Sequence, residues 1–179
     1  MTKAIVATIL LMLIVVSPLA HAEDVQVVLT DQDIALIRTN CVGVQSSMQR
    51  VHSSDALARY NLAQQYNIIS TKLMAPMNSR VSLNKLNGVA MTQTTVDFDE
   101  TVSEFKLMYQ QYEETTSRAL KMNCKDQPVS FYDTLVMARS QKAAVRDAIN
   151  RINILLQQYD TQFDQLRAQA LQKTTGVTP

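Results

Sequence analysis

Apolar side chains recur every third and fourth residue along most of this chain. The longest such stripe lies in the C-terminal third, where its spacings alternate between three and four residues. Its members are Leu135, Ala138, Lys142, Val145, Ile149, Ile152, Leu156, Tyr159, Phe163, Leu166 and Ala170, and Lys142 is the one charged member. This heptad spacing predicts a single helix over 128–172, roughly 67 Å long, with Pro128 at its first position.

A second heptad stripe lies near the start of the chain. Its members are Ile34, Ile37, Cys41, Val44, Met48 and Val51. The stripe predicts a helix over 31–52, with Thr30 as the N-cap and Asp33 as its capping-box partner. The polar run "HSSD" at 52–55 interrupts the stripe, so a separate helix is expected over 54–75, capped by Ser53 or Ser54.

Pro76 should kink or end that helix, because proline has no amide hydrogen and its ring crowds the preceding turn. A shorter helix is predicted over 77–87, with Gly88 as its terminator. A further helix is predicted over 95–122, where aromatic and apolar residues recur at helical spacing. These elements predict an all-α fold, a kinked three- or four-helix bundle or antiparallel coiled coil with long helices, in one domain over 23–172.

The N-terminal segment has the pattern of a secretory signal peptide. Lys3 precedes an uncharged apolar run at 4–16, and "AHA" at 20–22 offers a cleavage site. We expect residues 1–22 to be removed and the protein to be exported, whether periplasmic, cell-surface or secreted. An uncleaved N-terminal membrane anchor is the alternative. No later run is long enough to span a membrane, and residues 173–179 are expected to form a flexible tail.

The two cysteines, Cys41 and Cys124, are expected to form an intrachain disulfide, because an exported protein folds in an oxidising compartment. A straight helical hairpin with its turn near residue 91 would place Cys124 opposite residue 58, about 25 Å from Cys41 along the axis. Closing the bond therefore requires a bend at 52–55 or at Pro76, or a different hairpin register. Pairing between molecules and two unpaired cysteines are the remaining alternatives.

Composition and motifs argue against several functional classes. The net charge of +1 gives no basic stripe for nucleic acid. Glycine-rich phosphate loops, nucleophile elbows and H-E-x-x-H motifs are lacking, and His52 is the only histidine after residue 22. The acidic run "DFDE" at 97–100 is best explained by the first turn of a helix, where carboxylates favour the helix dipole. We therefore expect no enzyme, no cofactor and no metal site.

The predicted C-terminal helix is longer than the helix over 95–122, so the far part of its stripe needs another cover. That part comprises Ile149, Ile152, Leu156, Tyr159, Phe163 and Leu166. The first region of the chain, another copy or a partner protein could cover these residues. An apolar stripe left uncovered is commonly an interaction site, so we identify this seam as the candidate interaction surface.

Two functions fit these expectations. The first is an exported, non-catalytic interaction or scaffold protein of the cell envelope, which binds itself or another envelope protein through the coiled-coil seam. The alternative is a periplasmic or extracellular module that holds a client or ligand. A signal peptide followed by long helices resembles the tentacled periplasmic chaperones, and this resemblance, which involves no particular residue, implies such a client-holding role.

Overall fold

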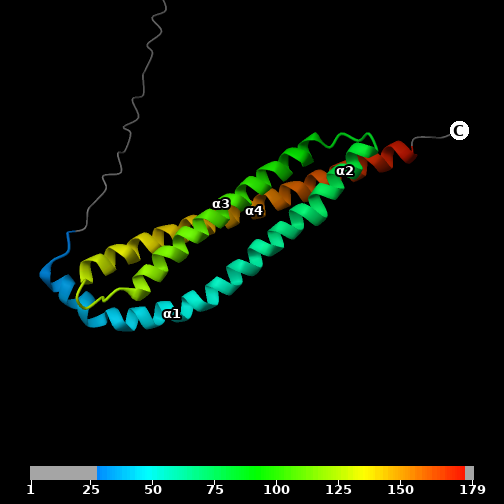
Figure 1. Ribbon diagram of the computed structural model, residues 1–179. Coiled ribbons are helices and arrows are strands. Elements are labelled where there is room, and N and C mark those ends of the chain that lie inside the picture. The colour runs from blue at the N-terminus through cyan, green and yellow to red at the C-terminus, as the bar shows by residue number, and fades with distance from the viewer. Residues whose placement is uncertain (1–27, 176–179) are drawn as a thin grey trace, which may run out of the picture.

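A computed structural model describes residues 28–175, and within that range the chain is helical with no strand (Figure 1). The elements are α1 (Asp31–Ile68), the π-helical η1 (Ile69–Met74), α2 (Ala75–Leu83), α3 (Val89–Lys121) and α4 (Pro128–Thr175). The predicted all-α bundle is confirmed. The predicted signal peptide lies outside the described residues, and α4 extends into the predicted tail as far as Thr175.

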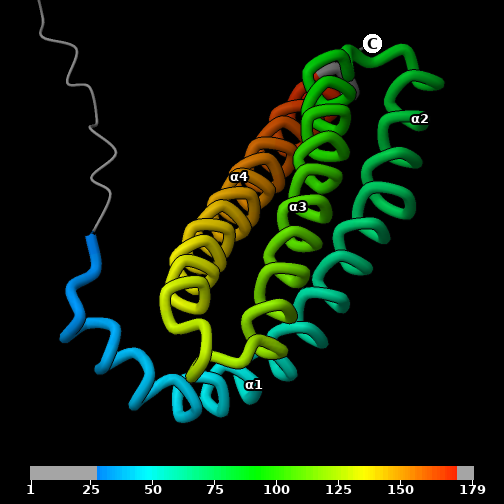
Figure 2. The backbone as a smooth tube through the Cα atoms, turned by 60° about the vertical axis from the view of Figure 1, so that its left-hand side comes forward, coloured from blue at the N-terminus to red at the C-terminus, as the bar shows by residue number. Residues whose placement is uncertain are grey.

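The bundle consists of a hairpin and a curved arm. Helices α3 and α4 lie side by side and antiparallel, while α1, η1 and α2 form one continuous helical rod, which we call the first arm (Figure 2). The first arm follows the hairpin but bows outward along α1, and the start of α1 reaches past the α3–α4 connection (Figures 1 and 2). The two described chain ends therefore lie at opposite ends of an elongated molecule.

Helix α1 does not end at the polar run 52–55, where the sequence predicted a break. Ser53 does not cap a new helix, because its hydroxyl donates back to the carbonyl of Gln49 at 3.0 Å. Asp55 and Arg59 form an ion pair one turn apart, and His52 contacts α3. Within this run His52 contacts α3 and Asp55 contacts α4, so the polarity of the run does not mark a helix end.

Pro76 changes the helix type without ending the first arm. In a regular α-helix its ring would meet the carbonyl of Lys72, four residues earlier. The π-helical turns of η1 directly before it widen the backbone, and the amide of Ala75 donates to the carbonyl of Ser70, five residues back. The predicted helices 54–75 and 77–87 are thus parts of one arm.

The turn between α2 and α3 lies earlier than predicted. The amide of Lys85 donates to Ser82 and that of Leu86 to Val81, which is the Schellman pattern that ends a helix. Lys85, with φ 55°, takes the left-handed position that glycine favours. Gly88 instead precedes α3, where a Cβ atom would lie 2.5 Å from Val81 Cγ1. Helix α2 therefore ends at Leu83 and α3 begins at Val89, six residues before the predicted start.

Three apolar clusters hold the first arm to the hairpin. The central cluster contains Phe98 and Phe105, both fully buried, with Tyr66 against them at ring-centroid distances of 6.1 and 5.9 Å. A second cluster surrounds Cys41 and Cys124 at the tip of the hairpin. A third joins Val81, Met91 and Leu166 at the α2–α3 turn. Among residues 28–175, no helix is both long and apolar enough to cross a bilayer.

The structure brings Cys41 and Cys124 together, with sulfur atoms 2.03 Å apart and Cα atoms 5.9 Å apart. A turn centred on residue 86, rather than 91, moves the position opposite Cys124 from 58 to about 48. The curvature of the first arm accounts for the remaining offset. Between the same two contacts with α3, the arm runs 26 residues, from His52 to Asn78, whereas α3 runs only 18, from Thr95 to Glu113. A different register and a bowed arm together close the bond.

Candidate functional site: a groove between α1 and α4

Most of the predicted interaction seam on α4 is covered by the chain itself. Ile152 and Leu166 are buried, and Ile149, Leu156, Tyr159 and Phe163 are half-buried. The first arm and α3 cover these residues, chiefly through the central cluster and the cluster at the α2–α3 turn. The seam is thus core of the bundle, because the first arm is long enough to cover it. An interaction surface must be sought elsewhere.

An open groove of about 530 Å³ lies where α1 bows away from α4. We call it the α1–α4 groove. Its lining comes from α1 (Asn40, Gly43, Val44, Ser47, Met48 and Val51), from α3 (Tyr112 and Thr116) and from α4 (Leu135, Ala138, Arg139 and Lys142). Helices α1 and α4 form the two walls and α3 contributes the two residues between them. The volume falls within the range of ligand-binding clefts.

Apolar residues of the first heptad stripe are left uncovered on the α1 wall. Val44 is 38 % exposed and Val51 is 51 % exposed, while Met48 between them is half-buried. On the opposite wall lie Leu135 and Ala138, members of the α4 stripe. Two heptad stripes therefore face one groove, although stripes of this kind normally pack against each other or against a third helix.

Gly43 lies in the α1 wall, and no packing contact among residues 28–175 requires a glycine there. A Cβ atom built there would meet nothing within 4 Å. Glycine in the middle of a helix destabilises it by about 1 kcal/mol relative to alanine. Because no contact in the described chain requires the missing side chain, Gly43 leaves room for the close approach of another backbone.

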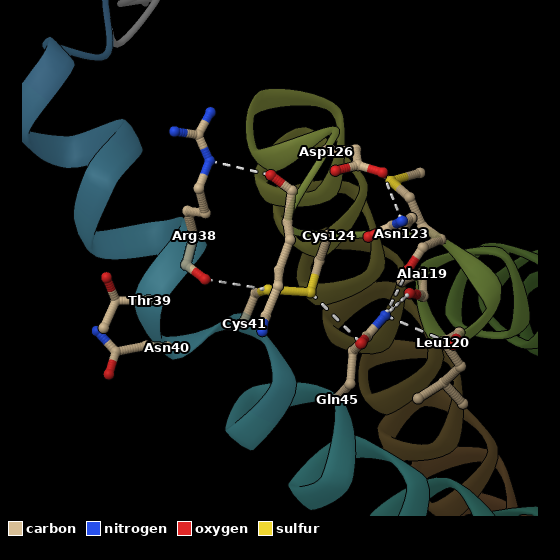
Figure 3. Close-up of a disulfide and its surroundings, with 12 residues drawn as sticks. Arg38, Thr39, Asn40, Cys41, Gln45, Ala119, Leu120, Asn123, Cys124 and Asp126 are labelled. Carbon is tan, nitrogen blue, oxygen red and sulfur yellow. Dashed lines mark hydrogen bonds between the residues drawn. A yellow bond between two sulfur atoms is a disulfide. The ribbon is translucent and has the colours of Figure 1, made fainter.

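One end of the groove is fixed by the disulfide and by side chains around it (Figure 3). Gln45 Nε2 donates to the carbonyl oxygens of Ala119 at 2.9 Å and Met122 at 2.8 Å. The Ala119 carbonyl also accepts from the Met122 amide at 3.4 Å, and Gln45 adds a second donor at this end of α3 from a distant part of the chain. Arg38 Nε also donates to the carbonyl of Lys125 at 3.0 Å.

The other end is fixed by a hydrogen-bonded chain between α1 and α3. His52 Nε2 lies 2.7 Å from Glu113 Oε2, and the Tyr109 hydroxyl donates to Glu113 Oε1 at 2.8 Å. Burial, followed by this hydrogen bond and by the charge of Glu113, raises the pKa of Tyr109 far above its ordinary value. These contacts tie α1 to α3 and to the α3–α4 connection at both ends of the groove.

The charged residues that line the groove are both cations, Arg139 and Lys142. Lys142 Nζ lies 4.0 Å from Asp55 Oδ2 and 5.8 Å from the centroid of the Tyr112 ring. Arg139 is exposed, and among the described residues its side chain has no ion pair. The rim of the groove therefore carries positive charge along α4.

Between the two walls, α3 contributes Tyr112 and Thr116 to the lining, and both residues are buried. Burial raises the pKa of Tyr112, and the nearby hydroxyl of Thr116 lowers it to a smaller degree. The two hydroxyls do not reach hydrogen-bonding geometry, since Thr116 Oγ1 is buried without a hydrogen-bond partner in the described part of the chain. Such a site offers mostly apolar contact with a single unused polar atom.

Three residues of the predicted seam also line a smaller groove of about 440 Å³ beside η1. They are Leu156, Tyr159 and Phe163. The Tyr159 hydroxyl lies 3.2 Å from the Met74 carbonyl and 3.0 Å from Asn78 Oδ1, and Asn78 Nδ2 donates to Thr95 at 2.8 Å. This network joins the first arm, α3 and α4, which indicates a structural role for these residues.

The chemistry that these residues can perform is contact and charge recognition. Within the range that the structure describes, no group of three or more His, Cys, Asp or Glu side chains could hold a metal ion. Sequence reasoning identified Val44, Met48 and Val51 as members of a heptad stripe but did not identify them as the wall of a groove. The groove depends on the bow of α1 away from α4, and no local pattern in the sequence reports that separation.

The chain matches no family model, and neither a curated protein nor a solved structure shows significant similarity to it.

Proposed function

We propose that this protein is an exported, non-catalytic interaction module of the cell envelope that holds an amphipathic helix of a partner protein in the α1–α4 groove. The observation that carries the proposal is the stripe of Val44, Met48 and Val51, whose two valines are exposed and which lies across the groove from Leu135 and Ala138. Export is supported by the signal-like pattern of residues 1–22 and agrees with the paired cysteines.

A helix suits the groove better than an extended ligand. Along the groove the molecule has three helices, and an added helix would complete a four-helix arrangement with heptad packing on both walls. Its outer face would remain in water, as the open groove requires. A ligand that is apolar all round would leave part of its surface exposed to water.

Photocrosslinking in the native envelope tests the proposal. A benzoylphenylalanine at position 44 or 51 should give one crosslinked species from both positions. The same group at Ile154, which is 61 % exposed on α4 outside the groove, should not give that species.

Substitutions at Gly43 supply the matched control. Gly43→Phe should place a ring in the open space above α1 and abolish the crosslink, while the circular dichroism spectrum and melting temperature stay near those of the wild type. Gly43→Ala should keep the crosslink and raise the melting temperature. A crosslink that persists in Gly43→Phe, or that forms equally from Ile154, would contradict the proposal.

A further inference from the structure

We infer that the helix held in the α1–α4 groove is acidic along the edge that lies against α4, with carboxylates placed to meet Arg139 and Lys142. This inference rests on the proposed function and adds the charge of the partner to it. It follows from the lining of the groove, in which the charged side chains are cations and both come from α4.

Arg139 is the stronger of the two determinants. It is exposed at the rim, and no ion pair among the described residues involves its side chain. Lys142 follows three residues later on the same face of α4, close to Asp55 at 4.0 Å. Asp55 also faces Arg59 at 3.5 Å, so Lys142 is only partly neutralised.

The other charged groups near the groove do not cancel this positive edge. His52 and Glu113 pair with each other at 2.7 Å beyond the Val51 end, and Glu113 also accepts from Tyr109. The α1 wall contributes uncharged residues to the lining. A partner helix would therefore meet apolar and small residues on the α1 side and cations on the α4 side.

The dimensions set the length and spacing of the partner. From Asn40 to Val51 the α1 wall runs about 16 Å, or three helical turns. A helix of that length can place apolar residues at heptad positions between the walls. Two carboxylates three or four residues apart would then lie along the edge that faces Arg139 and Lys142.

Three synthetic peptides test the charge of the partner. They share one apolar heptad face and differ only in the two flanking positions, which carry Glu, Gln or Lys. Fluorescence anisotropy with the oxidised protein should show the Glu peptide binding most tightly, with a ratio on the order of ten over the Lys peptide at low salt. Added salt should reduce that ratio, because rim charges are screened.

A charge reversal locates the effect. Arg139→Glu should reverse the order of the Glu and Lys peptides, whereas Arg146→Glu, at another exposed arginine two turns further along α4 and outside the groove lining, should leave the order unchanged. Gly43→Phe should abolish binding of all three peptides. Equal affinities for the Glu and Lys peptides, or no effect of Arg139→Glu, would overturn the acidic edge while leaving the groove as a binding site.

Other occupants give distinct results. Tighter binding of sodium palmitate than of the Glu peptide would overturn the helix as the ligand in favour of an acyl carboxylate. A concentration-dependent dimer that Gly43→Phe dissolves would identify the occupant as a second copy. If no peptide binds and positions 44 and 51 give no crosslink, the proposed function itself fails.

Discussion

At the scale of single residues, the backbone conformation is most demanding at the α2–α3 turn. Lys85 holds φ at 55° and Gly88 allows Val81 to approach closely. Glycine thus stands at the position where contact forbids a side chain, and lysine at the position where conformation favours glycine. The sequence placed a helix end here but assigned it to Gly88, because a lysine carries no signal for the left-handed region.

We expect Lys85→Gly to stabilise the protein by about 1 kcal/mol, since a left-handed conformation costs a residue with a Cβ atom about that much. Gly88→Ala should destabilise it, because its Cβ would collide with Val81 Cγ1. Urea unfolding followed by circular dichroism measures both changes. Opposite signs for the two substitutions are required, and a loss of stability in Lys85→Gly would contradict the assignment of the Schellman turn.

Four tyrosines make the stability of the fold sensitive to alkaline pH. Burial is the largest cause that raises the pKa of Tyr66, Tyr109, Tyr112 and Tyr159 above the ordinary value of 10.0. A phenol with a raised pKa in the folded state holds its proton more tightly than in the unfolded state. Its contribution to stability is therefore complete below pH 10 and is lost as pH rises above that value.

Alkaline titration tests this sign. Absorbance of the phenolate should rise at higher pH in the folded protein than in the urea-unfolded protein, and the free energy of unfolding should fall from pH 9 to pH 11. Tyr109→Phe should reduce the size of that fall. An unchanged pH dependence in Tyr109→Phe would show that its hydrogen bond to Glu113 is not linked to folding.

At the scale of elements, the heptad stripes predicted the helices well, because they record which face of each helix is buried. Thr30 and Asp33 form the predicted capping box, and α4 begins at the predicted Pro128. Two predicted ends inside the first arm are absent for separate reasons. The polar run 52–55 pairs with the hairpin, and the π-helical turns accommodate Pro76. The first depends on a contact with another helix and the second on a change of helix type, and neither is visible in the heptad pattern.

The π-helical element depends on a hydroxyl from another helix. Tyr159→Phe removes the donor that reaches the Met74 carbonyl and Asn78, and should destabilise the protein by about 1–2 kcal/mol. Tyr60→Phe is the control, because Tyr60 is 63 % exposed and should change stability by less than about 0.5 kcal/mol. Equal effects of the two substitutions in urea unfolding would argue against the network around η1.

At the scale of the whole molecule, the register between the first arm and the hairpin decides where the cysteines and the groove lie. Sequence reasoning paired Cys41 with Cys124 and required a bend or a changed register, but it could not choose between them. The register follows from the turn at residues 84–88 and from long-range pairs such as His52 with Glu113. The α1–α4 groove is a product of that same register, which is why the candidate site was not predicted.

The disulfide closes a separation of 83 residues, and its removal should cost about 4–5 kcal/mol if the entropy of the unfolded chain dominates. The paired substitution Cys41→Ala with Cys124→Ala, compared with oxidised wild type in urea unfolding, measures the change. The loss in free energy of unfolding should be larger than the loss caused by Gln45→Ala, which removes side-chain contacts at the tip of the hairpin but keeps the disulfide. Equal stability of the double cysteine variant and the oxidised wild type would mean that packing alone fixes α1 at this end.

The bond between Cys41 and Cys124 also gives the protein a distinctive response to tension. A pull applied between residues 28 and 175 would pass from the start of α1 through the sulfur atoms and directly into α4, so residues 42–123 lie outside the mechanical path. Stretching the oxidised protein should load the α4 wall of the groove, while the α2–α3 turn and the groove residues from Gly43 to Val51 stay outside the loaded path. Reduction should release a hidden length of up to about 290 Å of extended chain, which single-molecule force spectroscopy would record as an added step.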